Sequence, residues 1–327
     1  MRSRNLGTAG PAVSTLGLGA MSMSGSYGPA DRDESIATIH AALDAGIDII
    51  DTGDFYGMGH NELLIRDALQ SVGRERVRLS VKFGALRGPD NAWGGIDNRP
   101  AAIRNFLGYT LTRLGTDHVD IYRPARLDPA VPIEDTIGTL SDLVKEGFVR
   151  YVGLSEVDAE TIRRAQAVHP IADLQVEYSL ISREPESGVL ATLRELGIGM
   201  TAYGVLSRGL ISGHWSAGRT WEPGDFRVNS PRFSAENMAH NVSLAESLRP
   251  IAEAHGATIA QLAIAWVLAQ GADIVPLIGA RTRTRLAEAL GALDVELNAD
   301  DLAAIERAIP AGSARGERYP AAVRTTR

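Results

Sequence analysis

Short apolar runs alternate with segments of helical periodicity along the whole chain. Eight of these runs are apolar on both faces, which is typical of parallel strands that helices cover on the outside. Between them, residues such as Ile36, Ile39 and Leu43 recur at helical spacing and place apolar side chains on one face. The pattern therefore predicts eight strands, at residues 16–20, 47–51, 77–82, 119–122, 151–154, 174–176, 199–203 and 274–278.

The repeated unit of strand, polar loop, helix and glycine predicts the fold class. Gly46, Gly147 and Gly197 follow helical runs, where glycine commonly ends a helix. Eight such units predict an α/β protein with a closed (β/α)8 TIM barrel, in a single domain spanning residues 1–327. A doubly wound open sheet is the alternative, but Ser22 stands where the third glycine of a dinucleotide-binding fingerprint would lie.

Three kinds of segment lie outside this repeat. Residues 3–6 and 12–15 flank a glycine-rich turn and predict a β-hairpin cap before the first strand. Residues 207–235 form a long connection rich in Gly, Trp, Pro and Arg, and long ordered connections are usually functional. Residues 298–309 predict an extra C-terminal helix, and the polar tail beyond them is expected to be mobile.

Composition narrows the chemistry. The 327 residues include no cysteine, which excludes disulfides, thiol nucleophiles and cysteine-ligated metals and fits a reducing cytoplasm. Lys and Arg number 33 against 40 Asp and Glu, and the net charge of −7 argues against nucleic acid as a partner. The most apolar stretch, residues 259–269, is too short to span a bilayer, and the N-terminus lacks the apolar core of a signal peptide. We therefore expect a cytoplasmic protein without a membrane partner.

Chemically useful side chains follow two successive strands. The second strand ends in Asp51-Thr-Gly-Asp-Phe-Tyr56, and the third ends in Ser-Val-Lys82. In a barrel these strand ends meet at one face, where a lysine would lower the pKa of a tyrosine and a carboxylate would orient the lysine. Each residue alone has a structural explanation, as a loop cap, a core aromatic or a solvated lysine. Together they predict a catalytic set in which Tyr56 protonates an alkoxide near neutral pH.

This set resembles the aldo-keto reductase superfamily. The family segment Asp-Thr-Ala-x-x-Tyr-Gly, followed by Glu, appears here from Asp51 to Gly57 with Glu62 after it, and the family's strand lysine matches Lys82. The resemblance extends over nearly the whole chain, from residue 16 to residue 291. It implies a (β/α)8 barrel that binds NADP(H) without a Rossmann domain. It also implies hydride transfer to a small-molecule carbonyl substrate, with the tyrosine as general acid.

One departure from the family pattern concerns the fourth strand. The family carries a histidine there, in a run like Asp-x-Tyr-x-x-His-Arg-x-Asp, and the matching position in residues 120–128 is Ala125. Loss of such a hydrogen-bond donor costs about 3 kcal/mol at the transition state. The reaction is expected to survive through Tyr56 and Lys82, above all for reactive aldehydes. Ala125 would also enlarge the floor of the substrate pocket.

The resemblance further assigns residues to the nicotinamide end of the cofactor. Ser155, Glu156 and Gln175 match the positions that hold the carboxamide, with Glu156 in place of the family's asparagine. Tyr203 matches the aromatic residue that stacks on the nicotinamide ring. The backbone from Gly204 would follow the pyrophosphate, so two further residues are assigned there, Leu206 and Arg208.

The adenosine end is assigned to the run after the eighth strand. This run is a short basic patch at a predicted helix N-terminus, which suits an anion such as the 2′-phosphate of NADP. Of its arginines we expect Arg285 to bind first and Arg281 second, with Gly279 and Glu288 beside them. The family's adenine-binding asparagine is Ala289 here. The alternative is a run of arginines on a solvated helix face.

Aromatic residues in the loops complete the expected site. Tyr27 and Trp93 are assigned to the substrate pocket, and Trp215 either joins them or anchors its loop. No histidine pattern that binds metal occurs, so we expect no metal site. The main hypothesis is an NADPH-dependent carbonyl reductase, and a homo-oligomer stays open. The alternatives are a pyridoxal-type reductase, a sugar or alcohol dehydrogenase, and an NADP-binding regulatory subunit with little turnover.

Overall fold

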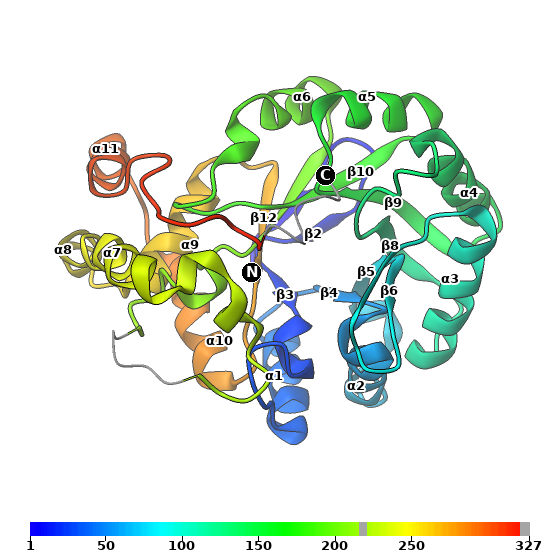
Figure 1. Cartoon of the computed structure of the whole chain (residues 1–327), viewed down its shortest axis with the longest axis horizontal. Coiled ribbons are helices and arrows are strands. Elements are labelled where there is room, and N and C mark those ends of the chain that lie inside the picture. Colours follow the sequence, from blue (N-terminus) through cyan, green and yellow to red (C-terminus); the bar gives the residue numbers. More distant parts are fainter. Residues whose placement is uncertain (216–220, 321–327) are drawn as a thin grey trace.

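The computed structural model describes residues 1–215 and 221–320. Its centre is a closed barrel of parallel strands surrounded by helices (Figure 1). Each of the eight predicted strand runs overlaps one barrel strand, so the predicted (β/α)8 fold is confirmed. In barrel order the strands are β10 (Ile171–Glu177), β11 (Gly199–Tyr203), β12 (Ile274–Ile278), β3 (Gly17–Gly19), β4 (Ile49–Gly53), β5 (Arg78–Phe83), β8 (Val119–Pro124) and β9 (Val149–Ser155).

Helices connect the strands and cover the outside of the barrel (Figure 1). Local chemistry sets their ends: Pro100 is the first residue of α3, and the Asn298 side chain caps the extra C-terminal helix α11. Gly197 ends α6 at a φ of 68°, which glycine adopts without strain. The helices are α1 (Arg32–Asp44), α2 (His60–Leu69), α3 (Pro100–Leu114), α4 (Ile133–Lys145), α5 (Ala159–Val168), α6 (Val189–Leu196), α7 (Ala235–Glu246), α8 (Arg249–Ala254), α9 (Ile259–Ala269), α10 (Arg283–Leu290) and α11 (Ala299–Ala308).

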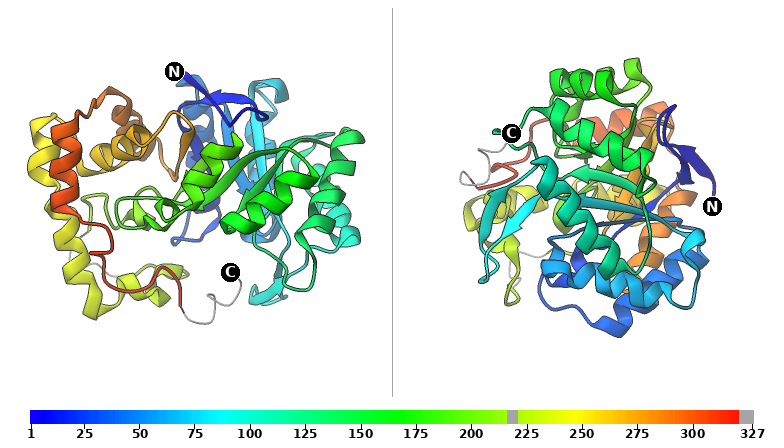
Figure 2. Two further views of the ribbon diagram at one scale, coloured as in Figure 1. Left: turned by 90° about the horizontal axis from the view of Figure 1, so that it is seen from above. Right: turned by 90° about the vertical axis from the view of Figure 1, so that its right-hand side faces the viewer.

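The predicted N-terminal hairpin is confirmed, with β1 (Ser3–Asn5) antiparallel to β2 (Ala12–Ser14). Leu6 and Val13 of this hairpin are buried against side chains from β4, β8 and β12, so the hairpin closes one end of the barrel. The C-terminal segment lies at the opposite end (Figure 2).

A second hairpin pairs β6 (Ala85–Arg87) with β7 (Trp93–Ile96) after strand β5. The sequence pattern does not predict this hairpin. Its strands are short, β7 holds two glycines, and every strand residue except Ala85 is partly or fully exposed, so no apolar run marks it.

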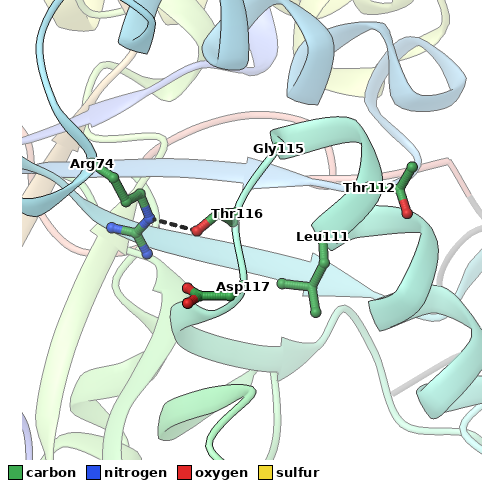
Figure 3. Close-up of a pocket in the computed structure, with 6 residues that line it drawn as sticks. All are labelled: Arg74, Leu111, Thr112, Gly115, Thr116 and Asp117. Carbon is green, nitrogen blue, oxygen red and sulfur yellow. Dashed lines mark hydrogen bonds between the residues drawn. The ribbon is translucent and has the colours of Figure 1, made fainter.

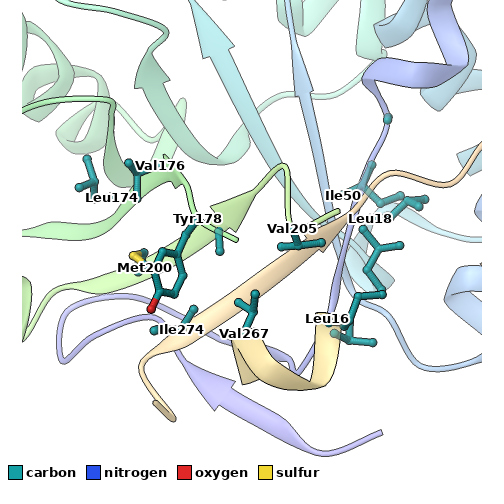
Figure 4. Close-up of a cluster of buried hydrophobic side chains, with 14 of the residues drawn as sticks. Leu16, Leu18, Ile50, Leu174, Val176, Tyr178, Met200, Val205, Val267 and Ile274 are labelled. Atoms are coloured by element: carbon teal, nitrogen blue, oxygen red, sulfur yellow. The ribbon is translucent and has the colours of Figure 1, made fainter. Parts of the chain in front are cut away.

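The main core lies between the strands and their covering helices. Leu18 on β3, Met200 on β11, Ile274 on β12 and Val267 on α9 are fully buried in one cluster (Figure 4). Full burial of one such side chain contributes about 1.5–3 kcal/mol, so this layer provides the main driving force for closing the barrel.

Helix α9 is the most apolar helix of the fold, and it is buried over most of its length. Within residues 1–215 and 221–320, no single helix is long and apolar enough to cross a membrane. The stretch Ala235–Ala254 meets the length and composition only together with α9, and the two are bent by 85°.

A buried ion pair lies in the barrel interior. Arg123 on β8 is fully buried, and its Nη1 donates to Asp173 Oδ2 on β10 at 3.0 Å and to Thr201 Oγ1 on β11 at 3.1 Å. Its Nη2 donates to Ser80 Oγ on β5 at 2.9 Å. Burial raises the pKa of Asp173, and the Arg123 guanidinium opposes that shift. The charge of Arg123 is therefore paired inside the barrel with a carboxylate from β10, which lies two strands away from β8.

As far as residue 320, the C-terminal tail differs from the expectation of a mobile segment, and residues 321–327 lie outside the described part. Arg318 and Tyr319 contact residues at the ends of the barrel strands, and Arg318 is only 5% exposed. Polar tails are mobile when nothing binds them, but this tail carries a cation that pairs with buried carboxylates. In the long connection at 207–235, short 3₁₀ turns follow β11, and residues 216–220 lie outside the described part.

The interior ion pair gives a stability prediction. Replacement Arg123→Met leaves Asp173 without its cation, so we expect the free energy of unfolding to fall by about 3–5 kcal/mol in urea denaturation. The matched control is Arg163→Met, because Arg163 pairs with Glu195 on the surface. An exposed pair is worth about 1 kcal/mol or less. Equal losses in the two variants would contradict this account of the interior.

Candidate active site

Asp51 and Lys82 meet at the carboxyl-terminal ends of β4 and β5, as their positions predict. Asp51 Oδ1 forms an ion pair with Lys82 Nζ, and both side chains are almost completely buried. Asp51 Oδ2 accepts from Gln175 Nε2 at 2.6 Å and from Ser80 Oγ at 2.9 Å. Burial lowers the pKa of Lys82, and Asp51 opposes that effect. The carboxylate therefore favours the charged form of the lysine against the effect of burial and fixes the lysine in position.

Tyr56 lies beside this pair in the turn that follows β4, with Lys82 Nζ 5.0 Å from its ring centroid. Burial, followed by the Asp51 charge, raises the pKa of Tyr56 well above its ordinary value, and Arg126 opposes the shift. This direction is opposite to the lowered pKa expected from the sequence. The ammonium is already paired with Asp51, so burial dominates. Tyr56 is therefore a protonated phenol, the form that a general acid requires.

Ala125 follows β8 and is buried, so a methyl group occupies the position that resembles the family's histidine. The neighbouring Arg126 Nη1 donates to the Ala125 carbonyl at 2.6 Å, and its guanidinium lies 6.0 Å from the Tyr319 ring centroid. The charged group next to this position is thus a guanidinium rather than an imidazole.

Glu156 and its neighbours form a second cluster at the ends of β9, β10 and β11. Ser155 is buried, and Glu156 Oε1 accepts from Tyr203 OH at 2.8 Å and from the backbone N–H of Glu177 at 2.9 Å. Burial and the Glu156 charge raise the pKa of Tyr203, which keeps its hydroxyl protonated as a donor. Gln175 lies between the two clusters, with its amide nitrogen bonded to Asp51.

Two residues of this cluster come from the C-terminal tail, which sequence analysis did not assign to the site. Arg318 Nη2 donates to Glu156 Oε1 at 2.8 Å, and Arg318 Nε lies 3.1 Å from Glu177 Oε2. The hydroxyls of Tyr319 and Tyr203 are 3.0 Å apart. No sequence pattern points to these contacts, because they join residues more than a hundred positions apart.

The backbone after β11 turns sharply, as a close approach to a ligand requires. Gly204 has a φ of 65° and Arg208 a φ of 59°, and Leu206 lies between them. The Arg208 guanidinium turns toward the tail, where Nη1 donates to the Arg318 carbonyl at 2.8 Å.

The basic run after β12 divides into residues with different contacts. Arg281 Nη1 donates to three consecutive carbonyls, beginning with that of Tyr27 at 3.1 Å. Arg285 pairs with Glu288 at 2.9 Å on the exposed side of α10. Arg283 instead pairs with Glu34 of α1 at 2.8 Å. Gly279 is exposed, and nothing lies within 4 Å of the position that a Cβ would take.

The aromatic residues assigned to the loops have different surroundings. Tyr27 packs on Phe226 with ring centroids 5.1 Å apart, and burial raises the pKa of Tyr27 to about 12. Trp93 is 42% exposed on the β6–β7 hairpin. Trp215 is buried 5.3 Å from the Phe233 ring centroid, the environment of a residue that anchors its loop.

A surface hollow elsewhere is lined by Arg74, Leu111, Thr112, Gly115, Thr116 and Asp117 (Figure 3). These residues precede β5 and β8, at the end of the barrel opposite to Asp51 and Lys82, where catalytic residues of this fold are not found. Among the described residues, no group of three or more His, Asp and Glu is placed to hold a metal ion.

Comparison with known proteins gives one consistent result. The Aldo/keto reductase family matches residues 15–310. A "probable aldo-keto reductase 1" of Glycine max is 42% identical over 317 residues, which are 96% of this chain and 90% of that protein. The glycerol dehydrogenase of Gluconobacter oxydans has a TM-score of 0.85 at 27% identity, covering 94% of both chains. A thermostable aldo-keto reductase solved with the inhibitor epalrestat has a TM-score of 0.75 at 28% identity, covering 94% of this chain and 100% of that one. The resemblance in the sequence is thus confirmed, and this chain belongs to the aldo/keto reductase family of oxidoreductases.

Proposed function

We propose that the protein is an NADPH-dependent reductase of aldehydes and reactive ketones. The observation that carries the proposal is the protonated phenol of Tyr56 beside the buried ion pair of Asp51 and Lys82. The phenol is a proton donor, and the ammonium stabilises the phenolate that remains after proton transfer. The carboxylate holds the ammonium in place.

The roles of these residues follow from their positions. A bound nicotinamide supplies the hydride that the carbonyl carbon accepts. Tyr56 transfers its proton to the carbonyl oxygen, so that an alcohol forms and the tyrosine becomes a phenolate. Lys82 lies over the ring and stabilises this anion, while Asp51 holds Lys82 in place. The same groups catalyse alcohol oxidation when Tyr56 starts as the phenolate and accepts the proton.

The surroundings of Gly279 support a phosphate-bearing cofactor. The open space at this glycine lies next to the N-terminus of α10, whose partial positive charge favours an anion. Arg285 is half exposed there. Its Nη1 contacts Glu288 and His214, and we assign its remaining donors to a 2′-phosphate, whereas Arg281 is tied to the loop after β3. We therefore infer a preference for NADP(H) over NAD(H), with Arg285 as its main determinant.

Tyr56→Phe tests the catalytic assignment. This change removes the proton donor without altering the ring, so we expect kcat for NADPH-dependent reduction of 4-nitrobenzaldehyde to fall roughly a hundredfold or more. Binding of NADP⁺, followed by tryptophan fluorescence, is expected to remain. Tyr109→Phe is the control, because Tyr109 is 57% exposed. Equal rates in wild type and Tyr56→Phe would refute the role of Tyr56.

Arg285→Met tests the preference for the phosphorylated cofactor. We expect KM for NADPH to rise roughly tenfold or more while KM for NADH stays the same, because only NADPH carries the 2′-phosphate. Arg283→Met is a matched control on the same helix, since Arg283 pairs with Glu34. Parallel changes for both cofactors would show that Arg285 does not read the phosphate.

Alcohol oxidation is the second candidate activity. The observation in its favour is the likeness to the glycerol dehydrogenase of Gluconobacter oxydans. Turnover of glycerol with NADP⁺, exceeding that of aldehydes with NADPH, would favour it. Binding of NADP⁺ with no turnover of any carbonyl or alcohol would instead favour a regulatory subunit.

A further inference from the structure

We propose that Arg318 of the C-terminal tail is a positioning residue of the nicotinamide subsite. By pairing with Glu156 and Glu177 it fixes Tyr203, the residue that we assign to the nicotinamide ring. The inference rests on the proposed function only in so far as the protein binds a nicotinamide cofactor. It assigns to the site a segment that lies beyond the last barrel helix.

The tail reaches the barrel mouth along a defined path. The Asn241 side chain on α7 forms two hydrogen bonds with the Arg315 backbone, to its carbonyl at 2.9 Å and from its N–H at 2.8 Å. Gly316 has a φ of 84°, and a Cβ there would lie 2.7 Å from the Pro231 carbonyl oxygen. Only glycine fits this close approach, so the chain direction that brings Arg318 inward is built into the fold.

Arg318 balances two buried carboxylates from adjacent strand ends. Its guanidinium is 2.8 Å from Glu156 and 3.1 Å from Glu177, and all three side chains are at most 5% exposed. Arg208 and Arg232 also face Glu177, but at 3.7 Å each. Two buried carboxylates side by side are costly unless a cation lies between them, and Arg318 is that cation.

This arrangement explains the glutamate found where the family pattern has asparagine. Glu156 takes a φ of 52°, a strained conformation for a side chain of this size, and its carboxylate is held by Arg318. Asparagine would need no such cation. Glu156 in the carboxamide motif and Arg318 in the C-terminal tail therefore depend on each other.

Tyr203 connects the pair of Glu156 and Arg318 to the proposed nicotinamide subsite. Its hydroxyl contacts Glu156 at 2.8 Å, Tyr319 at 3.0 Å and Arg318 at 3.3 Å. Three contacts at the hydroxyl end leave the ring little freedom to tilt. A ring that is fixed before binding loses less conformational entropy when a nicotinamide stacks on it.

Arg318→Met tests the proposal by cofactor binding instead of turnover. We expect Kd for NADP⁺, measured by tryptophan fluorescence, to rise about tenfold or more, and KM for NADPH to rise more than kcat falls. Arg315→Met is the matched control, because Arg315 lies in the same segment with an exposed side chain. An unchanged Kd, or tighter binding as expected of an inhibitory tail, would overturn the proposal.

A rescue experiment separates positioning from a general loss of structure. If Arg318 acts by compensating Glu156, Glu156→Gln in the Arg318→Met background should return Kd to within about threefold of wild type. Arg318→Lys, which keeps the charge, should fall between wild type and Arg318→Met. Thermal melting shows whether each variant is folded. Failure of Glu156→Gln to rescue a folded Arg318→Met protein would show that Arg318 does not act through Glu156.

The pair also predicts a change in acid stability. Burial alone would raise the pKa of Glu156, but Arg318 and Arg126 lower it from 4.5 to about 2. A lowered pKa means that the ionised carboxylate favours folding, so its contribution is present above pH 4.5 and is lost as the pH falls toward 2. Arg318→Met should therefore shift the midpoint of acid unfolding to higher pH, although Tyr203 and the backbone of Glu177 still donate to Glu156. An unchanged midpoint would contradict the pairing.

The experiments distinguish failure of the Arg318 proposal from failure of the proposed function. Wild-type protein that binds NADP⁺ but reduces no carbonyl would refute the reductase and leave the Arg318 experiments valid. Wild-type protein that turns over aldehydes, with cofactor affinity indifferent to Arg318, would refute only the role of the tail.

Discussion

The ion pair between Asp51 and Lys82 is the constraint on which the rest of the site depends. A lysine at the end of an apolar strand is stable only with a carboxylate beside it, and the carboxylate in turn needs further donors. Gln175 and Ser80 supply them, and Ser80 also accepts from Arg123. The reactive end of the barrel is therefore continuous with the ion pair inside it. A change deep in the barrel and a change at the mouth act on one network.

In the second cluster, too, buried charges need opposite charges beside them, but here the cation comes from a distant part of the chain. Glu156 follows β9 and Glu177 ends β10, and Arg318 lies within 3.1 Å of both carboxylates. The C-terminal tail supplies this cation, so the final residues of the fold complete a site built from its middle strands. The pairing of Arg318 with two buried carboxylates is a physical reason for this polar tail to be held at the barrel.

Much of this molecule is predictable from its sequence because the relevant signals are local. Apolar runs mark the barrel strands, and strand ends mark Asp51 and Lys82. Arg123 also has a local signal, because it is a charge inside an apolar strand. Arg318 has none, because its partner Glu156 is 162 positions away. The sequence predicts a lowered pKa for Tyr56, which is wrong, because it shows that a lysine is near but not that the lysine is already paired with Asp51.

On the proposed function, the effect of Ala125 on the reaction depends on the raised pKa of Tyr56. A phenol with a high pKa is a weak acid, and without an imidazole beside the carbonyl it receives less help in stabilising the developing alkoxide. Arg126 is a cation that opposes the rise in the pKa of Tyr56, so on the proposed function it would take over part of the electrostatic stabilisation that the imidazole provides. On the proposed function, such a site favours carbonyl groups that are already electrophilic. This is the physical reason to place reactive aldehydes ahead of simple ketones among its substrates.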